Sequence, residues 1–135
     1  MRKIISLLII IVVLILPGCT AFGSNVDDAI SSISNNDIAS VKISAAYTDF
    51  DDLIITDEAD IKTLVEFIEK LNLSKSSRET GSFGGKGYYI EFQFTDGDTI
   101  GITLFGQSLM VGYHIKEILD DYEKHLANMI KEFQE

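Results

Sequence analysis

Residues 88–105 read YYIEFQFTDGDTIGITLF, and this stretch decides the fold. Each half alternates apolar and polar residues, which is the pattern of a strand with one buried face. Asp96-Gly97 stands between the halves, and an Asp-Gly pair flanked by alternating runs is the strongest short signal for a β-hairpin. We therefore expect an antiparallel hairpin whose core side carries Tyr88, Ile90, Phe92, Phe94, Ile100, Ile102 and Leu104.

Three further strands are expected, two before this hairpin in the sequence and one after it. Residues 41–47 alternate apolar and polar side chains, as a half-buried strand does. Residues 53–55 form a short run rich in β-branched side chains, which favour strands. Residues 109–111 follow a turn at Gly106-Gln107-Ser108. The expected sheet thus has about five strands.

The helices are predicted from apolar spacings of three and four residues. Asp57 suits an N-cap, and the apolar stripe Ile61, Leu64, Val65, Ile68, Leu71 follows it. A longer stripe predicts an amphipathic helix over residues 115–133, and its members are Ile115, Ile118, Leu119, Tyr122, Leu126, Met129, Ile130 and Phe133. The spacing of Val26, Ala29, Ile30 and Ile33 allows a short first helix that stops at residues 35–37.

This order of elements predicts an α+β fold. Residues 26–135 are expected to form a single domain, with an antiparallel sheet of about five strands and two main helices packed on one face. The short helix near residue 26 would be added to these. The alternating pattern suits a sheet with its other face in water.

The first 18 residues have the layout of a secretory signal peptide. Arg2 and Lys3 precede an apolar run from Ile4 to Leu16, which is about 13 residues long. A membrane-spanning helix needs about 20 residues, so the run is too short for a permanent span. We expect residues 1–18 to be removed.

Leu16-Pro17-Gly18-Cys19 resembles the lipobox of bacterial lipoproteins, with Pro17 standing where that family usually has Ala or Ser. The resemblance implies cleavage before Cys19 and diacylglycerol on its sulfur. Cys19 is the one cysteine of the chain, so no internal disulfide competes for it. Residues 19–25 would then be a lipidated tether, and the expected location is the extracytoplasmic face of the cell membrane.

Residues 38–119 are similar in their loose hydrophobic pattern to small uncharacterised surface lipoproteins of Gram-positive bacteria. The stretches that carry this likeness are Ile54-Ile55-Thr56-Asp57, the Gly-rich segment, which is the Ser- and Gly-rich loop predicted over residues 72–87, and residues 88–97. The resemblance implies a Gram-positive surface protein and transfers no catalytic residue.

Charge excludes nucleic acid as a partner. The whole chain has a formal net charge of −10, and loss of Arg2 and Lys3 with the signal makes the remainder more acidic still. Nucleic-acid binding depends on clustered Lys and Arg. The expected partners are instead the lipid bilayer, through diacylglycerol on Cys19, and an envelope protein.

No residue set predicts catalysis or a cofactor. Residues 81–87 contain Gly-Gly-Lys but lack the spacing and the hydroxyl of a phosphate-binding loop. His114 and His125 would lie about 16 Å apart on one helix, too far to share a metal. Asp49, Asp51 and Asp52 do not fit a calcium loop, although a weak site with Asp57 stays open. We therefore predict a non-enzyme without catalytic or metal residues.

Two aromatic residues are candidates for binding a partner. Phe83 stands in the Gly-rich segment, and Tyr89 points to the side of its strand opposite the core. Together they would form an exposed apolar spot. The predicted function is a non-catalytic, membrane-anchored binding or envelope-associated module. The alternatives are an inhibitor or immunity-type protein that blocks a target, and a small surface enzyme or metal-dependent factor.

Overall fold

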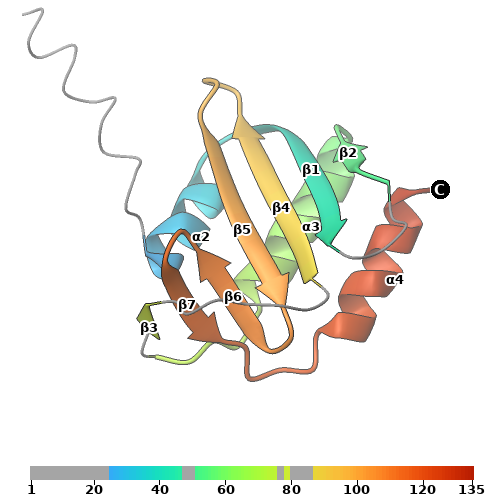
Figure 1. Cartoon of the computed structure of the whole chain (residues 1–135). Coiled ribbons are helices and arrows are strands. Elements are labelled where there is room, and N and C mark those ends of the chain that lie inside the picture. The colour runs from blue at the N-terminus through green and yellow to red at the C-terminus, as the bar shows by residue number, and fades with distance from the viewer. Residues whose placement is uncertain (1–24, 47–50, 76–77, 80–86) are drawn as a thin grey trace, which may run out of the picture.

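The computed structural model describes residues 25–46, 51–75, 78–79 and 87–135. Within these residues it is an α+β fold with three helices and one antiparallel sheet of seven strands in the order β2-β1-β4-β5-β6-β7-β3 (Figure 1). The elements are α2 (Val26–Asn35), β1 (Ile38–Ala46), β2 (Leu53–Ile55), α3 (Glu58–Glu69), β3 (Arg78–Glu79), β4 (Gly87–Phe94), β5 (Thr99–Phe105), β6 (Ser108–Val111), β7 (His114–Glu117) and α4 (Glu123–Phe133). The predicted fold class is confirmed, with two more strands than the five expected.

The hairpin of residues 88–105 forms the centre of the sheet. Tyr89 pairs with Thr103 and Phe92 with Ile100, so the apolar side chains of β4 and β5 share one face. Strand β1 lies antiparallel to β4 on the other side, with Val41 opposite Phe92. Gly97 has a φ of +97° in the connecting turn, a conformation that glycine adopts without strain.

The helices pack on the inner face of the sheet, and one continuous core joins the two layers. Figure 1 shows α2 and α3 behind the strands, with α4 beside the ends of β1, β4 and β5. Deeply buried side chains from helices and strands belong to the same cluster, which includes Ile33, Leu64, Ile68, Phe92, Ile102 and Leu126. This burial is the main force that holds helices of this length in place.

The N-terminal ends of α2 and α3 are capped by side chains. Asn25 Oδ1 accepts a hydrogen bond from the Asp28 N–H at 2.9 Å, so the predicted short first helix is confirmed. Asp57 Oδ1 accepts from the Ala59 N–H at 3.1 Å, as expected for the second helix. Each cap satisfies a backbone donor that the helix leaves unpaired.

The predicted long helix over residues 115–133 is wrong in its first part. His114–Glu117 is strand β7, and helix α4 begins only at Glu123. Gly112, with a φ of +58°, turns the chain so that β7 pairs with β6, and Ile115 lies opposite Met110. Residues 114–117 form a strand and not a helix because β6 would otherwise present an unpaired edge.

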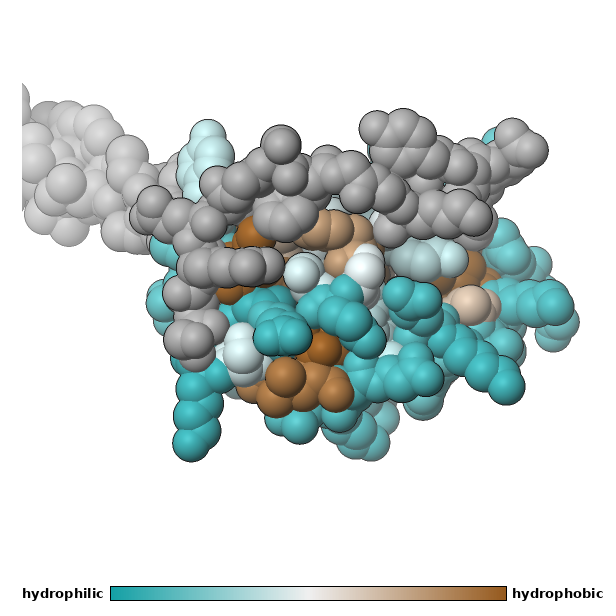
Figure 2. Space-filling view, turned by 60° about the horizontal axis from the view of Figure 1, so that its bottom comes forward, coloured by the Kyte–Doolittle hydropathy of each residue, from teal (hydrophilic) through white to brown (hydrophobic). Residues whose placement is uncertain are grey.

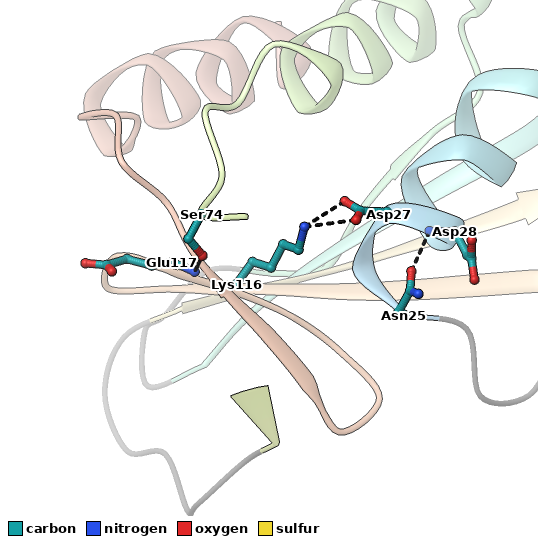
Figure 3. A network of polar contacts seen from close by, with 6 residues as sticks. All are labelled: Asn25, Asp27, Asp28, Ser74, Lys116 and Glu117. Atoms are coloured by element: carbon teal, nitrogen blue, oxygen red, sulfur yellow. Dashed lines mark hydrogen bonds and ion pairs between the residues drawn. The ribbon is translucent and has the colours of Figure 1, made fainter. Parts of the chain in front are cut away.

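The residues just after α3 also join this side of the molecule. The predicted loop over residues 72–87 begins with a bridge between Leu73 and Ile118. The Ser74 N–H donates to the Glu117 carbonyl at 2.9 Å, and the Ser74 hydroxyl accepts from the Glu117 N–H at 3.0 Å (Figure 3). These bonds fix the segment between β7 and α4 in an extended form, which excludes a continuous helix through it.

Candidate functional site

One row of side chains crosses the inner face of the sheet and ends in a pocket. The strand register places Ala45 opposite Tyr88 and Tyr88 opposite Leu104. The start of α4 covers this row, with Glu123 and Ala127 one turn apart on the same side of the helix. This partly open pocket has a volume of about 250 Å³ and is lined by Ala45, Gly87, Tyr88, Leu104, Gly106, Tyr122, Glu123 and Ala127.

Tyr122 lines the pocket and is almost fully buried, at 4% exposure. Its hydroxyl donates a hydrogen bond of 2.5 Å to the carbonyl oxygen of Gly106, in the turn that follows β5. A buried tyrosine needs such a partner because an unpaired hydroxyl is costly away from water. The bond also ties the start of α4 to the end of β5.

The polar groups around Tyr122 favour its neutral form. Burial, followed by the nearby Glu123 carboxylate and the Tyr88 phenol, raises the pKa of Tyr122 to about 12. Tyr88, Tyr122 and Glu123 each carry an oxygen in the side chain, and all three line the pocket. An apolar cavity with a few convergent polar groups is the usual form of a small-ligand site.

Tyr89, a predicted binding residue, lies on the outer face of the sheet as expected and is 44% exposed. Its ring lies over Gly101 on the neighbouring strand, where a β-carbon would overlap the phenol. Partial burial raises the pKa of Tyr89, Glu91 raises it further, and Lys42 lowers it. Phe83 and Cys19 lie outside the described residues, so the joint spot of Phe83 and Tyr89 stays a prediction.

The acidic and histidine candidates are separated by the fold. Asp52 pairs with Lys42 at 3.5 Å, and Asp57 serves as the cap of α3. His125 packs on the ring of Phe67 with centroids 5.4 Å apart, whereas His114 belongs to β7 rather than to the same helix. Among the described residues, no group of three or more His, Cys, Asp or Glu side chains is placed to hold a metal ion. Asp49 lies outside those residues.

Lys116 is the one buried charged side chain in the described part of the chain. It continues the same inner row, since Leu104 pairs with Leu109 and Leu109 with Lys116. Its ammonium group donates to both carboxylate oxygens of Asp27, at 3.0 and 2.9 Å (Figure 3). The far end of the row thereby holds the first turn of α2.

Large apolar side chains on the surface are scattered. Among the described residues they are Ile54, Tyr89, Tyr113 and Leu119. Figure 2 shows small brown areas between teal side chains on the coloured part of the lower face. Single exposed apolar residues of this kind are common in folded proteins and do not identify an interface.

Comparisons with protein-family models, with curated proteins and with solved structures found no match for this chain. The candidate site therefore rests on its own geometry. Sequence reasoning placed Tyr122 only in an apolar helix stripe and did not single out Glu123. The available signal was a tyrosine within that stripe, whose hydroxyl must find a partner when it is buried.

Proposed function

We propose that this chain is a lipid-anchored binding module on the extracytoplasmic face of the cell membrane, and that it acts without catalysis. The pocket under Tyr122 carries the binding part of this proposal, because it combines apolar walls with converging oxygen atoms. The N-terminal pattern supports the anchoring part. Two cations, a short apolar run and Cys19 after Gly18 have the order found in lipoprotein precursors.

None of the helices in the described residues is long and apolar enough to cross a bilayer. One acyl chain gives only marginal membrane binding, whereas two chains on a glycerol give a stable hold. Cys19 is the side chain that would carry them.

The tether would keep the domain close to the bilayer. Six peptide units join Cys19 to Asn25, and a fully extended chain of this length spans about 20 Å. Asn25 caps α2, and Asp27 in the first turn of α2 is bound by Lys116. The tether therefore enters a firmly held part of the domain.

Replacing the lipidated residue tests the proposal. The full chain with Cys19→Ala should leave the membrane fraction and lose incorporation of a labelled fatty acid, because no other side chain matches the lipobox sulfur. Ser24→Ala, in the same tether, is the control and should behave as the wild type does. Membrane pelleting of processed Cys19→Ala to the wild-type extent would refute the lipid anchor.

A further inference from the structure

We propose that the pocket under Tyr122 binds a small ligand with a short apolar body and a protonated amine. This inference rests on the proposed function of a non-catalytic binding module and names the chemistry of its ligand. The pocket volume of about 250 Å³ is below the range of drug-sized sites, which begins near 300 Å³. The ligand is therefore small.

The apolar part of the ligand would contact the row formed by Ala45, Tyr88 and Leu104. These residues face the helices in register across β1, β4 and β5, and Leu104 is fully buried. Ala127 adds a methyl group from α4. Small side chains at Ala45 and Ala127 leave the space open, because a larger residue at either position would fill it.

Of the three oxygen-bearing side chains in the pocket, Tyr122 and Glu123 can only accept hydrogen bonds from a ligand. The single hydroxyl hydrogen of Tyr122 is already given to the Gly106 carbonyl. Toward a ligand, the Tyr122 oxygen can therefore only accept. The Glu123 carboxylate also only accepts, and it makes no ion pair within the described residues.

Charge complementarity then selects a cation. Glu123 is the charged residue among the described lining side chains, and no Lys or Arg stands with it. Lys124, the next residue, lines a different groove between α3 and α4. A ligand carboxylate would meet Glu123 as a like charge, whereas an ammonium group supplies three donors to a site rich in acceptors. The net negative charge of the chain acts in the same direction.

The test compares n-butylamine, n-butanol and butyrate as probes of equal length. The lipidated full chain, held in phosphatidylcholine nanodiscs and labelled with ¹³C at alanine methyl groups, is titrated with each probe. We expect saturable shifts of the Ala45 and Ala127 methyl signals with butylamine at the lowest concentration, and no shift of Ala29 in α2. Butyrate should produce no saturable shift.

Three variants test whether butylamine binding depends on the Glu123 charge and on the open space beside Ala127. Glu123→Gln should weaken butylamine binding about fivefold or more, because it removes a charged acceptor. Glu132→Gln makes the same change of charge on the same helix outside the pocket and should alter affinity less than about twofold. Ala127→Leu, at an exposed helix position, should abolish the Ala45 shift by filling the cavity.

Several results would overturn the inference. These are no saturable shift with any probe, binding of butanol or butyrate as tight as that of butylamine, or equal weakening by Glu132→Gln and Glu123→Gln. The lipid anchor is scored separately, by membrane pelleting from the cells that express the same proteins. A membrane-bound protein with no amine binding would thus refute the ligand class and leave the anchor standing.

Discussion

The ion pair between Lys116 and Asp27 offers a sharp test of how α2 is held on the sheet. The Lys116 side chain is 9% exposed and the Asp27 side chain 68% exposed, and their closest distance is 2.9 Å. Replacing Asp27 by Asn leaves the Lys116 ammonium group buried without its counter-ion. We predict that Asp27→Asn lowers the free energy of unfolding and that the loss depends on Lys116.

The magnitude follows from the unequal exposure of the two partners. Removing one member of a fully buried pair costs about 3–5 kcal/mol, whereas a fully exposed pair contributes about 0.2–1 kcal/mol. Because water reaches Asp27 but hardly reaches Lys116, we expect Asp27→Asn to cost about 1–2 kcal/mol. Lys116→Met keeps the length of the side chain and leaves a hydrated carboxylate, so its cost should be smaller.

Equilibrium urea unfolding of the wild type, the two single variants and the double variant measures this coupling. Asp28→Asn is the matched control, because it removes the same charge from the same helix turn without touching Lys116. Its loss should stay within the roughly 0.3–1 kcal/mol that a helix dipole explains. A cost of Asp27→Asn no larger than that of Asp28→Asn, or one unchanged by Lys116→Met, would refute the reasoning.

Two further predictions concern the tyrosines. Because burial raises the pKa of Tyr122 from its ordinary value of 10.0 to about 12, the unfolded chain ionises this phenol first. The contribution of the neutral phenol to stability should be complete below pH 10 and fall as pH rises toward 12. Between pH 9 and about 11.5, the melting temperature of Tyr122→Phe should therefore fall less steeply with pH than that of the wild type. Equal slopes in the two proteins would contradict this. Gly101→Ala should displace the Tyr89 ring, since the new methyl group overlaps it. In NMR spectra the ring signals of Tyr89 should shift, while those of Tyr122 should not. Unshifted Tyr89 signals would contradict the packing of this ring on Gly101.

The central part of the fold could be predicted because its signals are local. The alternation in residues 88–105 and the Asp96-Gly97 turn both favour the observed hairpin, and the register confirms it. Asp57 and the apolar stripe after it predicted α3 because a helix cap and its buried face lie within a few turns of one another. The first helix follows from the same kind of spacing.

The region after Gly112 could not be predicted in this way. Ile115 and Ile118 fit the stripe of a helix as well as they fit a strand, so spacing alone could not choose between them. The choice depends on β6, which needs a partner strand, and on Asn72 and Ser74, which bind the backbone of Leu119 and Glu117. Asn72 and Ser74 lie far away in the sequence, and only the folded chain brings them to this place.

The amino-acid sequence by itself determined the fold class, the central hairpin and the capped helices, because each depends on neighbours within a few residues. It also carries the entire case for Cys19, whose surroundings lie outside the described residues. Tertiary structure alone decided where Lys116 finds Asp27 and where Tyr122 meets Gly106 and Tyr88. The physical reason is that a buried polar group must be paired, and the fold supplies its partner from a distant part of the chain.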